Sequence, residues 1–178
     1  YMFSHCTNFK GKGLENWNVS NVTNMRNMFG LCNKFESKGL ENWNVSNVTN
    51  MRLMFYGCHK FEGKGLENWD VSNVTDMESM FLNCKKLDCN LSNWDISNVI
   101  NMNGMFFGCE LFEGKGLEKW DVSNVTNMYG MFCFCHKFEG KCLENWSVSN
   151  VINMRNMFYE CENLDCDLSD WDVSNVIN

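Results

Sequence analysis

Apolar residues recur along the chain in a fixed order, most visibly around seven tryptophans. Neighbouring tryptophans are separated by a nearly constant interval, at Trp17, Trp43, Trp69, Trp94, Trp120, Trp146 and Trp171. A fixed period of this size is typical of a solenoid, in which each repeat forms one coil stacked on the last. The pattern therefore predicts one solenoid segment over residues 1–178, made of about seven coils. Because both ends of the sequence fall inside a repeat, we expect the segment to be cut within a coil at each end.

One repeat predicts the elements of a coil. Residues 66–75 hold four apolar positions two or three apart, which predicts two short strands that meet in a bend at Ser72 and Asn73. In residues 77–87 the apolar positions are spaced at i, i+3, i+4, i+7 and i+10, which predicts a short α-helical or 3-10 segment. Thr75 or Asp76 stands where its N-cap is wanted. Residues 61–65 contain two glycines and are predicted to turn the chain back towards the first strand.

Stacking converts each repeated position into a column. The tryptophan, valine, methionine, phenylalanine and cysteine columns are predicted to form one apolar core, which we favour over a cofactor-binding stripe. One asparagine also recurs in every repeat, and we expect its amide to bind backbone groups left unpaired at the bend. These asparagines are Asn21, Asn47, Asn73, Asn98, Asn124, Asn150 and Asn175.

Charged residues form columns as well, and these give the candidate site. Like charges on neighbouring coils repel one another unless the chains reach into water, so the columns mark either a solvated edge or a stripe that binds a partner. The coils of Trp94 and Trp171 are one residue shorter and interrupt the columns. The interval from Trp94 to Trp171 equals that from Trp17 to Trp94, which suggests duplication of a three-coil unit. The candidate interaction stripe comprises Lys38, Glu41, Lys64, Glu67, Lys115, Glu118, Lys141 and Glu144.

The net charge and the hydropathy of the chain limit the classes of partner that we expect. The formal net charge is −7, whereas a nucleic-acid binder needs a basic face, so we expect no nucleic-acid partner. No run of 18 or more apolar residues exists, so no part of this segment is expected to insert into a membrane.

Eleven cysteines are the remaining candidates for chemistry. Seven share one column, and four, Cys89, Cys133, Cys142 and Cys166, lie outside it. No Cys-x-x-Cys pair exists and the three histidines lack metal-ligand spacing, so we predict buried thiols and no metal site. That favours a reducing compartment, although bridges between adjacent cysteines of the column stay open. No nucleophile with a base and no phosphate-binding loop is found, so we expect neither catalysis nor a cofactor.

The stretch from Trp120 to Cys135, Trp-Asp-Val-Ser-Asn-Val-Thr-Asn-Met-x-x-Met-Phe-x-x-Cys, resembles the 26-residue repeat of bacterial surface proteins, the BspA-like relatives of leucine-rich repeats. The resemblance covers essentially the whole chain. It implies a leucine-rich-repeat-like right-handed solenoid, with short parallel β-strands and short helical or 3-10 segments in each 25–26-residue coil. It also implies adhesion or protein interaction at a cell surface or on a virion, and it supplies no catalytic residues. The many thiols leave an intracellular reducing site open.

Two functions of different classes follow. The leading hypothesis is a non-enzymatic protein-interaction or surface-adhesion module with a protein partner. The alternative is a structural component of a filament, capsid or shell that self-associates by stacking of solenoids, because unpaired strand edges invite such pairing. Ice binding through a threonine column is weaker, since isoleucine replaces threonine at Ile100, Ile152 and Ile177.

Overall fold

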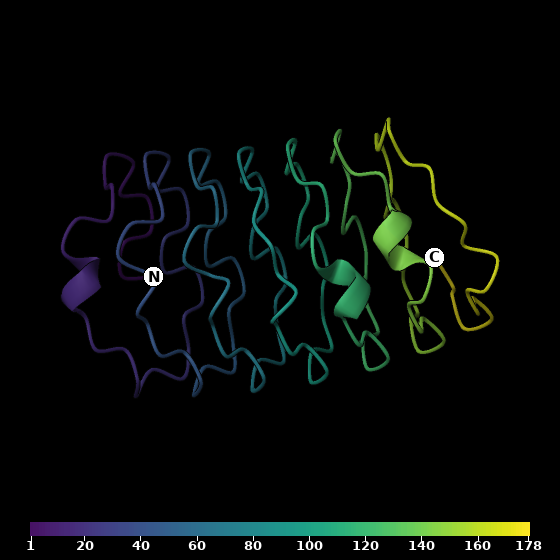
Figure 1. Ribbon diagram of the computed structural model, residues 1–178, viewed down its shortest axis with the longest axis horizontal. Coiled ribbons are helices and arrows are strands. Elements are labelled where there is room, and N and C mark those ends of the chain that lie inside the picture. Colours follow the sequence, from purple (N-terminus) through teal and green to yellow (C-terminus); the bar gives the residue numbers. More distant parts are fainter.

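The computed structural model describes all residues from Tyr1 to Asn178. The chain runs in successive coils that lie side by side along the long axis of the molecule (Figure 1). The first coil lies at one end of this axis and the last at the other, so each inner coil has a neighbour on both sides. We name each coil by its tryptophan.

Neighbouring coils are joined by backbone hydrogen bonds that run along the long axis. The N–H groups of Met51 and Phe55 donate to the carbonyl oxygens of Asp76 (3.0 Å) and Met80 (2.9 Å) in the next coil. The pairing is parallel and takes the form of isolated bridges, because turns interrupt the ladder on both sides of each bridge. The two short strands predicted over residues 66–75 are absent, and that prediction is wrong. The bridged positions are Asn24, Asn50, Asp76, Asn101, Asn127 and Asn153.

The helical segment predicted over residues 77–87 is absent, and that prediction is wrong. Four turns, each closed by an i to i+3 hydrogen bond, occupy its place. In the first the Met80 N–H donates to the Met77 carbonyl oxygen (3.1 Å), and in the third the Cys84 N–H donates to that of Phe81 (2.8 Å). The third residue of the first turn, Ser79, has a φ of 54°. A turn closed by an i to i+3 bond brings apolar residues i and i+3 to the same side, so the sequence spacing imitates a helix.

The remaining N–H groups explain why no helix forms here. The N–H groups of Ser79 and Phe81 donate to the carbonyl oxygens of Asn103 (2.8 Å) and Met105 (3.0 Å) in the next coil. An α-helix would direct these donors to its own chain four residues earlier. The N–H groups that the predicted helix would need are therefore already bonded to the next coil. The predicted N-cap residue Asp76 instead accepts a hydrogen bond from the Glu78 N–H (3.0 Å) and supports the start of the turns.

Regular helix occurs in only three short 3-10 segments, each in the glycine-bearing stretch. They are η1 (Leu14–Asn16), η2 (Leu117–Lys119) and η3 (Lys141–Leu143). A left-handed glycine precedes each of them, with φ of 97° at Gly13, 91° at Gly116 and 80° at Gly140. The fold contains no helix with the length and apolar character that a transmembrane span requires.

The interior is one continuous apolar column, which confirms the prediction that the repeated apolar positions are core. Aromatic rings stack from coil to coil: the centroids of Trp43 and Trp69 are 6.4 Å apart, and those of Phe55 and Phe81 are 5.8 Å apart. The tryptophans also hold the coils together through their indole nitrogen. The Trp69 Nε1–H donates to the Leu40 carbonyl oxygen (3.0 Å) of the preceding coil, and the tryptophans from Trp43 to Trp171 repeat this bond.

The asparagine column has the structural role that was predicted. The Asn73 side-chain Nδ2–H donates to the Ser46 carbonyl oxygen (2.8 Å) in the preceding coil. The bend beside it is closed by the Val74 N–H, which donates to the Val71 carbonyl oxygen (2.9 Å). The same side-chain bond is made by Asn47, Asn98, Asn124, Asn150 and Asn175.

Candidate interaction face

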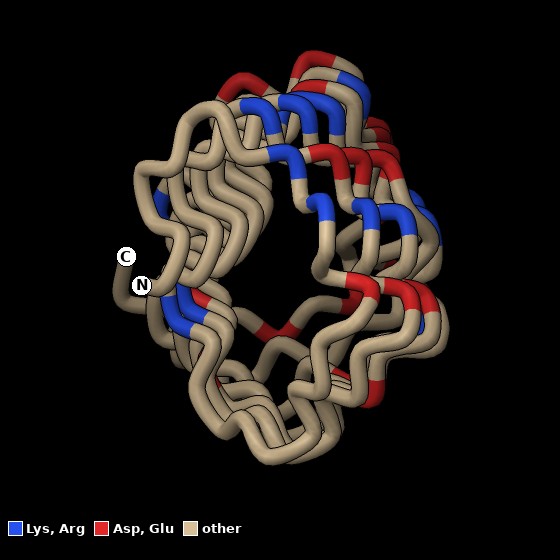
Figure 2. Tube along the Cα trace, turned by 90° about the vertical axis from the view of Figure 1, so that its left-hand side faces the viewer, with Lys and Arg blue, Asp and Glu red and all other residues tan.

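Four charged columns run along one side of the stack, and we call this side the charged face (Figure 2). In order along each coil they are an outer lysine column, an inner acidic column, an inner lysine column and an outer acidic column. Their members are, respectively, Lys34, Lys60, Lys86 and Lys137; Glu36, Glu62, Asp88, Glu113, Glu139 and Asp165; Lys12, Lys38, Lys64, Lys115 and Lys141; and Glu15, Glu41, Glu67, Glu118 and Glu144.

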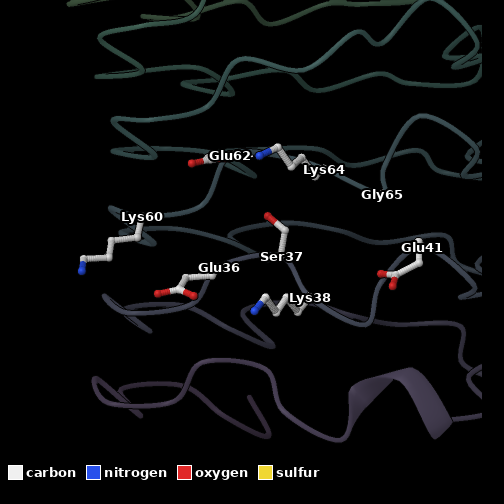
Figure 3. A pocket seen from close by; sticks show the side chains of 8 residues that line it. All are labelled: Glu36, Ser37, Lys38, Glu41, Lys60, Glu62, Lys64 and Gly65. Atoms are coloured by element: carbon white, nitrogen blue, oxygen red, sulfur yellow. Dashed lines mark ion pairs between the residues drawn. The ribbon is translucent and has the colours of Figure 1, made fainter.

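The structure brings three of the predicted stripe residues into one groove. Lys38, Glu41 and Lys64 line an open hollow of about 430 Å³ between the Trp43 and Trp69 coils (Figure 3). No apolar side chain lines it. The other lining residues are Glu36, Ser37, Lys60, Glu62 and Gly65.

The other predicted residues are distributed over further parts of this face. Lys115 and Lys141 line a second polar hollow of about 530 Å³ between the Trp120 and Trp146 coils. Glu67 borders a separate hollow beside Trp69, and Glu118 and Glu144 are exposed outside all of these hollows. The predicted stripe is thus a series of grooves between coils, not one continuous channel.

Ion pairs on the charged face join the two inner columns. Lys64 pairs with Glu62, and the hydrogen bond between them lowers the pKa of Glu62 and raises that of Lys64. Lys115 lies 3.0 Å from Asp88 in the preceding coil and 3.1 Å from Glu113 in its own, and these bonds raise its pKa. Lys38 makes no ion pair. The like charges within a column are therefore only partly offset by neighbours of opposite sign.

Some glutamates of the outer acidic column have a local structural role that the sequence analysis missed. The carboxylate of Glu41 accepts a hydrogen bond from the Gly39 N–H (2.9 Å), and that of Glu67 accepts one from the Gly65 N–H (2.7 Å). Both glycines have φ near 90° (89° and 90°). These two carboxylates stabilise the left-handed turn, so a partner would compete with the fold for one oxygen of each.

Ser37 is the residue of the first groove that departs from the repeat. The equivalent positions in the other long coils are Gly11, Gly63, Gly114 and Gly140. Ser37 is 2% exposed, has a φ of 73° and has a hydroxyl group without a hydrogen-bond partner. Both the positive φ and the unpaired hydroxyl destabilise the folded state.

Replacing Ser37 by glycine is therefore expected to stabilise the protein. Removing the unpaired hydroxyl and the strained φ outweighs the greater flexibility of glycine in the unfolded chain, for a net gain of about 1–2 kcal/mol. Urea unfolding followed by tryptophan fluorescence measures the difference. Ser46→Gly is the matched control, because the Ser46 hydroxyl donates to Asn44 Oδ1 (2.7 Å) and its substitution should destabilise. A Ser37→Gly variant less stable than the original chain would contradict this account.

The cysteines are free thiols, most of them buried, as the sequence predicted. In the cysteine column the thiols from Cys32 to Cys161 each donate to a carbonyl oxygen of the preceding coil; the Cys84 Sγ–H, for example, donates to that of Phe55 (3.0 Å). Burial raises the pKa of Cys32 and Cys161 to about 11, and it raises that of the fully buried Cys84 further. No group of three or more His, Cys, Asp or Glu side chains is arranged to hold a metal ion.

An exposed aromatic cluster on the turns was also missed. The ring centroid of Phe134 lies 5.5 Å from that of Phe107 and 5.4 Å from that of Tyr159, which it meets edge to face. Phe134 is 37% exposed and has a φ of 59° at a position where Gly57 and Gly108 stand in other coils. The residue before the column cysteine has a positive φ in every coil, whether it is a glycine or a larger residue such as Leu31 or Glu160. No residue type at this position in the sequence signals the aromatic cluster.

Comparison with protein families matches the chain to the model described as Mycoplasma protein of unknown function, DUF285, over residues 1–115 and 102–178. No curated protein matches. Among solved structures, an internalin (inlF) from Listeria monocytogenes str. 4b F2365 is 6% identical, with a TM-score of 0.20. The match covers 76% of this chain and 54% of the internalin chain. The plant peptide hormone receptor RGFR1, in complex with RGF2, is 11% identical, with a TM-score of 0.15. The match covers 83% of this chain and 47% of the receptor chain. The chain spans about half the length of each.

Proposed function

The chain belongs to the family described as Mycoplasma protein of unknown function, DUF285, and we propose that it is a non-enzymatic module that binds a protein through the charged face. The observation that carries the proposal is the open groove between the Trp43 and Trp69 coils, about 430 Å³ in volume and lined without any apolar side chain. Such a surface offers charged contacts over several coils and no enclosed pocket for a small molecule.

The mixed signs of the columns support a protein as the partner. A phosphate backbone requires a surface of one sign, whereas lysine and glutamate columns here alternate. A protein surface can present both signs at matching spacing, and such complementarity sets specificity and association rate. The wide lateral surface of stacked coils is the kind of surface that repeat proteins use for binding.

The finer classification belongs to the same proposal. We place the chain among the BspA-like surface repeats, with a leucine-rich-repeat-like right-handed solenoid and display on a cell surface or a virion. The regular period of the tryptophans and the parallel bridges between coils support this placement. An adhesive surface protein needs no catalytic centre, and the charged columns of this face consist of repeated lysine and acidic positions.

Crosslinking from two sites tests the proposal. A photoreactive residue at Lys60, on the charged face, should capture a protein in cells that make the chain natively. The same residue at Thr75, which is exposed outside that face, should capture at least several-fold less. Reversing Lys38 and Lys64 to glutamate should reduce capture from position 60 to the level of position 75. Equal capture from both sites, or none from position 60, would contradict a role for the charged face.

A further inference from the structure

We propose that the partner on the charged face is a second copy of this chain, placed side by side with its stack pointing in the same direction. This inference rests on the proposed function and names the partner of that surface. It follows from the order of the four columns across the face, which is lysine, acid, lysine, acid.

An alternating pattern with an even number of columns is complementary to itself under one symmetry operation. Consider a two-fold axis parallel to the stack, lying between the inner acidic and inner lysine columns. It places the inner acidic column of one copy opposite the inner lysine column of the other, and the outer lysine column opposite the outer acidic column. Homodimers of this kind use the same patch on both copies.

The alternative two-fold axis, perpendicular to the stack, is excluded by charge. It would place every column opposite itself, with Lys38 and Lys64 of one copy facing lysines of the other. Like charges directly opposite one another are destabilising. The column order therefore specifies a dimer whose two stacks run parallel.

The parallel arrangement also brings together the coils in which the charged columns are interrupted. Rotation about an axis parallel to the stack does not change the position of a coil along the stack. Each coil therefore faces the equivalent coil of the second copy, and the short Trp94 coil of one copy faces the short Trp94 coil of the other. At the two ends the inner columns carry a single sign, with Lys10 and Lys12 in the first coil and Asp165 and Asp167 in the last. We therefore place the contact over the four inner long coils, those of Trp43, Trp69, Trp120 and Trp146.

Dimerisation would complete the charge balance of the face. An inner lysine such as Lys64 would lie between Glu62 of its own coil and the acidic column of the second copy, while Lys38, which has no ion pair within the chain, would gain a partner. Exposed pairs contribute little singly, so the dimer depends on a network over four coils and is sensitive to salt.

Sedimentation velocity with three variants tests the arrangement. The lysine-reversed variant carries Lys38→Glu, Lys64→Glu, Lys115→Glu and Lys141→Glu. The acid-reversed variant carries Glu36→Lys, Glu62→Lys, Glu113→Lys and Glu139→Lys. The column-swapped variant carries all eight changes and has the net charge of the original chain. Far-UV circular dichroism and thermal unfolding establish that each variant is folded.

The original chain should dimerise at about 20 mM salt and lose at least tenfold in affinity at about 0.5 M, where charges are screened beyond about 4–5 Å. Each reversed variant alone should dimerise at least tenfold more weakly. A one-to-one mixture of the two should recover a heterodimer, and the column-swapped variant should recover the homodimer, because both restore opposite charges across the axis.

Three results would overturn the inference: a monomeric original chain at low salt, reversed variants that dimerise unchanged, or a folded column-swapped variant that stays monomeric. The crosslinking experiment separates this failure from that of the proposed function. Capture of a different protein from position 60 by a monomeric chain would refute the second copy and leave the interaction module standing. Absence of any capture from that position would refute both.

Discussion

Replacing Trp69 by alanine is expected to lower the free energy of unfolding by about 3–5 kcal/mol. The indole ring is 2% exposed, its centroid is 6.4 Å from that of Trp43, and its Nε1–H donates to the Leu40 carbonyl oxygen. Alanine removes the buried ring, leaves a cavity between two coils and leaves that carbonyl without this donor. Because each coil contacts only its neighbours, the cavity at Trp69 separates the apolar core of the coils before it from that of the coils after it.

Two controls separate the contributions to this effect. Trp69→Phe keeps an aromatic ring but loses the bond to Leu40, so it should cost less than the alanine change. Trp17→Ala removes the same residue type from the same column, but Trp17 is 38% exposed and should cost less than half as much. Urea unfolding followed by circular dichroism measures all three. Equal losses at Trp69 and Trp17 would contradict the view that burial between coils sets the effect.

The columns could be predicted from sequence because a repeat multiplies weak signals. One tryptophan beside a valine says little, but seven at a nearly constant interval fix which positions face the interior. The asparagine column follows by the same reasoning, since an amide repeated at every bend has a backbone group to bind at every bend. The charged columns were likewise located, and three of their predicted members line one groove.

Local backbone geometry could not be predicted in this way. Met77, Met80 and Phe81 have helical spacing, but turns closed every three or four residues produce the same spacing. Leu53 and Ser79 have positive φ (58° and 54°), although neither residue type signals it. Their conformation is imposed by hydrogen bonds to the next coil, which become apparent only when coils are stacked.

The finer features of the charged face were missed for a related reason. Glu41 looked like one member of a charge column, whereas its bond to the Gly39 N–H depends on the left-handed turn between them. Ser37 is unusual only by comparison with the glycines at equivalent positions, and its buried, unpaired hydroxyl is a property of the packed coils. Such features require the conformation of the individual coil, which the repeat pattern does not encode.

The second large effect is expected at alkaline pH, where the free energy of unfolding should fall steeply. Burial raises the pKa of the fully buried thiols Cys58, Cys84, Cys109 and Cys135 well above that of an exposed cysteine, about 8.5. Below pH 8.5 these thiols are protonated in both states, so their contribution to stability is fully present. Above it the unfolded chain loses protons that the folded chain keeps, and each thiol removes up to about 1.4 kcal/mol per pH unit.

Four such thiols would together remove roughly 5 kcal/mol by one unit above pH 8.5, and the loss continues until the folded thiols ionise. Urea unfolding between pH 7 and 10.5, with a reductant present, gives the slope of stability against pH. Lysines and tyrosines titrate in the same range, so the decisive quantity is the difference between variants. Cys84→Ala should reduce the slope by about one proton relative to the original chain. An unchanged slope in this variant would mean that the Cys84 thiol ionises as readily in the folded chain as in the unfolded one, and that burial between coils does not exclude its charge.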